Sequence, residues 1–158
     1  MFKLDKKEMM IQTLGKFVDM TSKELPDDVM AKLTELRAKE EKPLAKAIYD
    51  VMFENMDKAK KLSRPTCQDT GVIQFFVRTG AKFPYLGELR AILREATIRA
   101  TKSAPLRLNA VEVFDEVNTG TNVGTDVPYI VWDIVDDSST VEIEVYQAGG
   151  GCSLPGRS

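Results

Sequence analysis

The spacing of apolar residues in this chain changes near residue 63, from a pattern typical of helices to one typical of strands. A chain with both patterns must combine helices with a sheet. Before that point, apolar residues recur every three or four positions, as on one face of a helix. Beyond it, residues 72–78 have the β-branched and aromatic composition of a strand. We predict one α+β domain, residues 1–158, with N-terminal helices packed on a small, largely antiparallel sheet.

The helical part contains three stretches of amphipathic spacing. Met10, Leu14 and Val18 predict a first helix, and the segment 29–39 predicts a shorter second one. The stripe of the third helix consists of Leu44, Ile48, Val51, Met52, Asn55 and Met56. Such a stripe could bind a partner, but this spacing is far more often the core side of a helix, so we expect it to be buried.

The second half alternates between one helix and strands. Residues 86–102 predict a helix with Leu89, Ile92, Leu93 and Ala96 facing inward. Residues 129–135 and 141–146 predict two strands joined by a polar turn. Because short connections favour neighbouring strands, we expect the two to form an antiparallel hairpin with one solvated face.

Composition excludes several functions. The chain has no histidine, so it cannot by itself build a histidine-based catalytic triad or a histidine-ligated metal site. The 22 Lys+Arg and 24 Asp+Glu residues leave a net charge of −2, which argues against nucleic-acid binding. No apolar run approaches the roughly 20 residues of a membrane span, and the first residues lack the apolar stretch of a signal peptide. We therefore expect a cytoplasmic protein.

A polar segment, Cys-Gln-Asp-Thr-Gly at 67–71, lies where a helix gives way to a strand. A thiol, an amide, a carboxylate and a hydroxyl on consecutive residues could converge on one ligand. The alternative is a structural cysteine followed by a turn at Asp69 and Gly71, and spacing alone favours that alternative.

Three further segments allow two interpretations each. The loop 118–122 could present amides and hydroxyls to a polar ligand, or it could be an ordinary turn. Arg107 could bind a carboxylate with its planar guanidinium, or it could lie on the solvated surface. Successive glycines at 149–151 could direct backbone N–H groups toward an anion, or they could form a flexible connection.

Together, these segments resemble class I fumarases and L(+)-tartrate dehydratases. The motifs occur in the family's order, at residues 67–71, 104–110, 116–122 and 148–151. The resemblance runs from about residue 55 to the end, and the segment 148–158 is most similar to the tartrate dehydratase alpha subunit. It implies an oxygen-sensitive hydro-lyase whose 4Fe-4S cluster is held by three cysteines, with one iron open as a Lewis acid. Tartrate dehydration to oxaloacetate is the implied reaction, with fumarate/malate as the alternative.

The resemblance also assigns residues. Cys67 corresponds to the first cluster ligand and Asp69 to a catalytic group that transfers a proton or orients the hydroxyl. The substrate-binding residues are Gln68, Arg107, Gly150 and Gly151. It gives Thr70 and the loop 118–122 shaping roles, and it does not assign Cys152 to the cluster.

The chain departs from the family pattern in what it lacks. Two further cluster cysteines are missing, and the usual catalytic base belongs to a beta subunit or a C-terminal domain. The sequence therefore resembles the N-terminal part of an alpha subunit from a hetero-oligomer, and we expect the isolated chain to be inactive. A non-catalytic partner-binding domain with the same fold is an alternative. A thiol-nucleophile enzyme built on Cys67 would lack a histidine to activate it.

Overall fold

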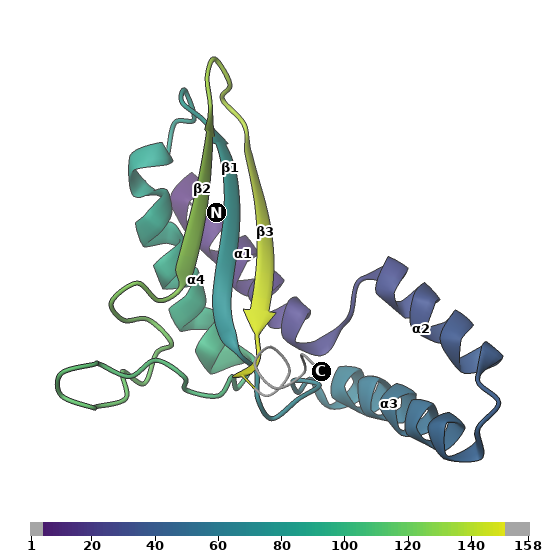
Figure 1. The fold of residues 1–158 in the computed structure, drawn as a ribbon. Coiled ribbons are helices and arrows are strands. Elements are labelled where there is room, and N and C mark those ends of the chain that lie inside the picture. Colours follow the sequence, from purple (N-terminus) through teal and green to yellow (C-terminus); the bar gives the residue numbers. More distant parts are fainter. Residues whose placement is uncertain (1–4, 151–158) are drawn as a thin grey trace, which may run out of the picture.

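The computed structural model describes residues 5–150 and confirms the α+β class (Figure 1). Its elements in chain order are α1 (Lys6–Lys23), α2 (Asp27–Lys39), α3 (Pro43–Leu62), β1 (Val72–Gly80), the short 3-10 helix η1 (Leu86–Glu88), α4 (Leu89–Ser103), β2 (Tyr129–Val135) and β3 (Val141–Ala148). Each helix and strand that the hydrophobic period predicts is present.

The three strands form a mixed sheet in the order β2-β1-β3. β1 pairs in parallel with β2, where Phe76 lies opposite Val131, and antiparallel with β3, where Phe76 lies opposite Glu144. The expected hairpin between β2 and β3 is therefore wrong, because β1 lies between these two strands. The sheet has one parallel and one antiparallel pair, rather than being largely antiparallel.

The turn 136–140 explains how β2 and β3 can be neighbours in sequence but not in the sheet. It must span two strand spacings, about 9.6 Å, across the end of β1. Gly80 makes this possible, because a Cβ at that position would overlap the Ser138 carbonyl. The Gly80 N–H instead donates to the Thr140 carbonyl at 2.9 Å. A glycine at the end of β1 thus allows the turn to cross it.

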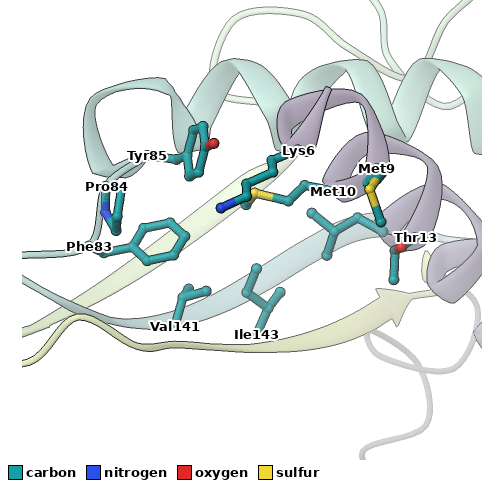
Figure 2. A pocket seen from close by; sticks show the side chains of 10 residues that line it. Lys6, Met9, Met10, Thr13, Phe83, Pro84, Tyr85, Val141 and Ile143 are labelled. Carbon is teal, nitrogen blue, oxygen red and sulfur yellow. The ribbon is translucent and has the colours of Figure 1, made fainter. Parts of the chain in front are cut away.

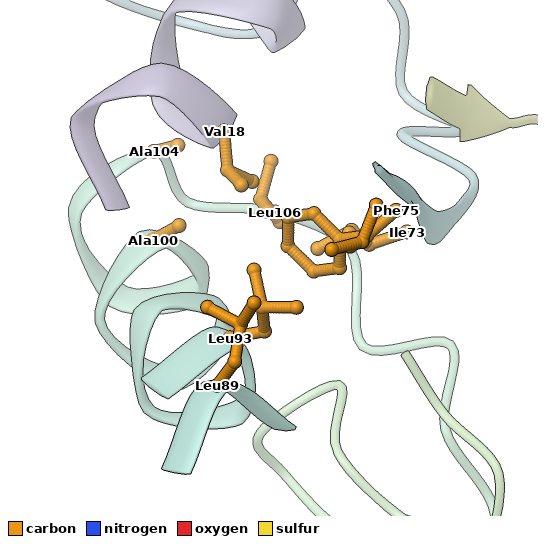
Figure 3. Packing of buried hydrophobic residues seen from close by; sticks show 9 residues of the cluster. Val18, Ile73, Phe75, Leu89, Leu93, Ala100, Ala104 and Leu106 are labelled. Atoms are coloured by element: carbon orange, nitrogen blue, oxygen red, sulfur yellow. The ribbon is translucent and has the colours of Figure 1, made fainter. Parts of the chain in front are cut away.

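The core lies between the sheet and helices α1 and α4, which cover one face of it (Figure 1). Alternate β1 residues point into this layer, and Phe75 is completely buried. α4 contributes Leu89 and Leu93, both completely buried as predicted. Figure 3 shows Val18 of α1 and Leu106 within the same cluster. This layer fixes the position of β1, at whose start the Cys67 segment lies.

An ion pair joins the two covering helices at the surface. Arg99 of α4 donates to both carboxylate oxygens of Glu8 on α1, at 2.5 and 3.0 Å. The guanidinium hydrogen bonds hold the pKa of Glu8 below its usual range. The pair is partly exposed, so we assign the stability of the α1–α4 contact mainly to the apolar core.

α2 and α3 form an arm that extends away from the sheet (Figure 1). α2 has no buried residue, and Ala59 is the one buried residue of α3. On α3, Leu44 is 76% exposed, Ile48 is 55% exposed and Val51 is 64% exposed. The expectation that this stripe faces the core is therefore wrong.

Within residues 5–150, no helix combines the length and the apolar character needed to cross a bilayer. α3 has 20 residues, but it carries lysines and acidic residues along its length.

Candidate functional site

The Cys67 segment connects α3 to β1 and is half exposed. Cys67 and Gln68 are exposed, whereas Thr70 and Gly71 are buried. The Thr66 N–H donates to the Ser22 carbonyl at 2.9 Å, which holds the start of the segment against the end of α1. The free thiol of Cys67 consequently faces solvent rather than the core.

Gly71 brings the end of β3 beside Asp69. Its φ is +75°, and a Cβ there would lie 2.5 Å from the Ala148 carbonyl carbon, so only glycine fits without strain. Its N–H donates to Asp69 Oδ1 at 3.3 Å. A Cβ at Gly149 would lie 3.6 Å from Asp69 Oδ2. The carboxylate therefore lies next to the backbone of the glycine loop.

Side chains hold the backbone of Arg107 on both sides. The Arg107 N–H donates to Thr70 Oγ1 at 2.9 Å, and its carbonyl accepts from Asn122 Nδ2 at 2.9 Å. Thr70 is 8% exposed and Asn122 is 5% exposed, so both bonds are partly shielded from water. The position of the Arg107 Cα is thereby fixed relative to the Cys67 segment.

Asn109 adds a second connection between the same segments. Its N–H donates to Asn122 Oδ1 at 2.7 Å, and its Nδ2 donates to the Gly71 carbonyl at 2.9 Å. Asn122 Nδ2 also donates to Thr101 Oγ1 at 3.2 Å, which anchors the network to α4. This geometry agrees with a shaping role for Thr70 and for the loop 118–122. Sequence reasoning did not single out Asn109 or Asn122 individually.

Two adjacent pockets share Arg107. One, of about 430 Å³, is lined by Cys67, Gln68, Thr70 and Arg107, together with two prolines. The other, of about 280 Å³, is lined by Asp69, Arg107, Asn109 and Gly150, with residues at the start of β1 and the end of β3. The structure thus brings five of the predicted site residues together, and their chemical roles stay predictions. Gly151 and Cys152 lie outside the described residues.

The Arg107 guanidinium forms no ion pair or hydrogen bond within residues 5–150. An arginine whose backbone is held while its five N–H donors remain available is suited to bind an anion, and its planar fork matches a carboxylate.

A larger apolar pocket, of about 500 Å³, lies between α1, the turn 83–85 and β3 (Figure 2). Met10, Phe83 and Ile143 are among its lining residues, and Lys6 is the one charged residue among those described. None of the sequence-predicted site residues lines it. With so few polar groups, it does not fit a dicarboxylate.

Metal ligands are sparse in the described part of the chain. No group of three histidine, cysteine, aspartate or glutamate side chains lies close enough there to hold a metal ion. Cys67 is the one cysteine at the shared pockets within residues 5–150. It fits one ligand position of a cluster, but the residues present do not complete a cluster site.

Asn122 allows a direct test of the network around Arg107. Asn122→Ala should lower the free energy of unfolding by about 1–3 kcal/mol, because it removes the hydrogen-bond partners of the Asn109 N–H and the Arg107 carbonyl, and both of these bonds are partly buried. Asn122 has a φ of 56°, so Asn122→Gly separates lost side-chain bonds from backbone strain. Asn118→Ala is the matched control, since Asn118 is exposed and water can replace its hydrogen bonds. Urea denaturation measures all three, and equal losses for Asn118→Ala and Asn122→Ala would contradict the prediction.

Comparison with known proteins assigns this chain to a family. The family model described as "Fumarate hydratase (Fumerase)" matches residues 11–158. The chain belongs to this family of fumarate hydratase-like proteins.

Individual relatives give more specific information than the family model does. The chain is 56% identical over 147 residues to the L(+)-tartrate dehydratase subunit alpha of Escherichia coli K12, and equally similar to the protein of that name from Shigella sonnei. In both cases the match covers 93% of this chain and 48% of the relative. The chain therefore spans about half the length of the curated relatives it matches.

Proposed function

We propose that the chain is the N-terminal part of the alpha subunit of an iron–sulfur hydro-lyase that dehydrates L(+)-tartrate to oxaloacetate. The observation that carries this proposal is Arg107, whose guanidinium is available at two pockets that also contain Cys67 and Asp69. Similarity to two tartrate dehydratase alpha subunits supports the choice of substrate.

In this proposal, the chain's own residues bind and orient the dicarboxylate. Arg107 binds one substrate carboxylate through two N–H donors and stabilises the negative charge that grows there as the neighbouring C–H proton leaves. Gln68 and the backbone of Gly150 and Gly151 bind polar oxygens of the substrate. Asp69 orients the departing hydroxyl or transfers its proton. The net change is loss of one water, which leaves the enol form of oxaloacetate.

The cluster is part of the proposal, with Cys67 as one of its ligands. A bound cluster would supply a Lewis acid for the leaving hydroxide, but the ligands present do not complete its site. We place the enzyme in the cytoplasm, where reducing conditions keep a thiol such as Cys67 free.

A partner completes this enzyme. The relatives are named as alpha subunits, and we propose that a beta subunit or an equivalent C-terminal domain supplies the catalytic base in a hetero-oligomer. The isolated 158-residue chain should accordingly be inactive.

Two alternatives rest on specific observations. Fumarate/malate is the closest alternative substrate pair, because the matching family model carries the name of fumarate hydratase. A non-catalytic partner-binding domain is the second, because the chain has only two cysteines.

Arg107→Lys in the assembled enzyme tests the proposal. We expect kcat/KM for L(+)-tartrate to fall about 10–100-fold while iron content is unchanged, because an ammonium cannot reproduce the two-pronged carboxylate contact. Arg78→Lys is the matched control, since Arg78 pairs with Asp133 on the exposed sheet face.

Assays with tartrate, malate and fumarate then separate the alternatives. Preferred turnover of malate or fumarate would replace the proposed substrate. No turnover of any of the three by the assembled, cluster-loaded enzyme would favour the non-catalytic domain, and unchanged kinetics in Arg107→Lys would remove Arg107 from the site.

A further inference from the structure

A hairpin between α4 and β2, residues 110–119, carries large apolar side chains in solvent. Phe114 at its turn is 98% exposed, more than any other large apolar side chain among the described residues. Figure 1 shows the segment between α4 and β2 extending away from the sheet. Four apolar side chains of this one hairpin are each more than half exposed: Val111, Val113, Phe114 and Val117. A contiguous exposed apolar surface of this kind is typical of an interaction site.

Backbone hydrogen bonds keep the tip of the hairpin away from the core. The Glu112 N–H donates to the Val117 carbonyl at 2.9 Å, and the Thr119 N–H donates to the Ala110 carbonyl at 2.9 Å. These bonds form two short antiparallel runs on either side of the turn. The apolar tip is therefore presented outward by an ordered stem, instead of folding back onto the domain.

The stem begins beside the pockets that share Arg107. Asn118 Nδ2 donates to the Leu108 carbonyl at 2.8 Å, one residue after Arg107. Asn109, the next residue, lines the pocket that also contains Asp69. A protein bound to the hairpin would consequently lie next to the candidate site.

The charge of the hairpin indicates the chemistry of its partner. It contains three acidic residues, Glu112, Asp115 and Glu116, and no lysine or arginine. None of the three forms an ion pair within residues 5–150. Carboxylates at the edge of a site would repel a dicarboxylate substrate unless nearby cations offset them. The complementary surface is thus an apolar pocket with lysine or arginine at its rim.

We propose that the 110–119 hairpin is a docking element for the beta subunit, which holds Phe114 in an apolar pocket with basic residues around it. This inference rests on the proposed function, in which the beta subunit completes the site. To supply the catalytic base, that subunit must reach the pockets around Arg107, and the hairpin places exposed apolar surface directly beside them. Its basic rim also offsets the charge of the three carboxylates near the substrate.

Calorimetric titration of the alpha subunit with the separately prepared beta subunit tests this proposal. Phe114→Ser should raise the dissociation constant at least about tenfold, because it removes an aromatic anchor from the interface. It should not change the urea midpoint of the alpha subunit, since the ring is 98% exposed. Ile134→Ser is the matched control: Ile134 is 57% exposed, but it lies beside Thr79 at the end of β1 far from the site, so the constant should not change.

Charge reversal tests the basic rim. Asp115→Lys should slow association of the two subunits at low ionic strength, and the difference from the unmodified subunit should shrink as salt is added, because salt screens the attraction between rim charges. Stopped-flow measurements at several salt concentrations record this effect. Equal association rates for Asp115→Lys and the unmodified subunit at low salt would contradict a basic rim.

These measurements record assembly rather than turnover, so they separate this proposal from the proposed reaction. Assembly that requires Phe114 would support the docking role even if the assembled protein did not dehydrate tartrate. Normal assembly and turnover in Phe114→Ser would overturn the docking role alone. A lower urea midpoint in Phe114→Ser would also overturn it, because the hairpin would then pack on the rest of the alpha subunit. So would a changed mass of the alpha subunit by itself, because the hairpin would then contact a second copy.

Discussion

In the assembled hydro-lyase that we propose, replacing Cys67 with serine should remove most of the cluster and lower tartrate dehydration below about 1% of the unmodified rate. A serine hydroxyl is a poor ligand for iron where a thiolate is required, and even indirect supports of a metal site contribute about 10–100-fold. Cys152→Ser should leave cluster content and turnover nearly unchanged, since the family resemblance assigns Cys67, and not Cys152, to a ligand position. Iron and sulfide analysis under anaerobic conditions, followed by a tartrate assay, measures both effects.

The position of Cys67 makes the result interpretable. Its side chain is exposed at a pocket beside Arg107 and takes no part in the core, so Cys67→Ser should not change the urea midpoint of the chain. A shifted midpoint would indicate a structural cysteine instead. Equal cluster loss in Cys67→Ser and Cys152→Ser would show that the two cysteines are not distinguished as we infer.

Strand pairing shows what local patterns can and cannot determine. In β3, Ile143 faces the core and Glu142 faces solvent, and that alternation is the same whether the neighbour is β2 or β1. The preference for adjacent strands therefore predicted a hairpin. What decides the order is long-range: β1 is the most buried strand and occupies the centre, and Gly80 lets the turn pass over its end.

α3 shows that a local sequence pattern does not determine burial either. Its spacing correctly predicts a helix, but periodicity states only that one face is apolar, not what covers that face. In the described chain, the arm holds Ile48 and Val51 away from the core.

The residues that line the two pockets were predictable where a family motif names them, as for Arg107. The network behind it was not, because Asn109 and Asn122 are residue types that ordinary turns also favour. Their importance depends on burial and on a positive φ at Asn122, which arise only when α4 and β1 have brought residues 70–71 and 101–109 together.

Phe75→Ala should be the most destabilising single change in the sheet, lowering the free energy of unfolding by about 3–5 kcal/mol. Phe75 is completely buried in the central strand, with Ile130 and Val145 opposite it on the two flanking strands. Removing the ring leaves a cavity among residues from α1, α4 and the segment after it, which are fixed by the rest of the core. Since domains of this kind are typically stable by about 5–15 kcal/mol, the variant should be close to its unfolding limit.

Phe76 provides the matched control, because it is the next residue along β1 and points to the opposite face, where it is 40% exposed. Phe76→Ala should lower the free energy of unfolding by about 1 kcal/mol or less. Urea denaturation of the two variants compares the same chemical change on the two sides of one strand. If Phe76→Ala were as damaging as Phe75→Ala, the outer sheet face would have to be buried in solution, against a second molecule rather than water. A large difference between the variants would instead show that the layer of α1 and α4 holds β1 in position. The same layer would then also fix the start of β1, next to which Asp69 and Gly71 lie.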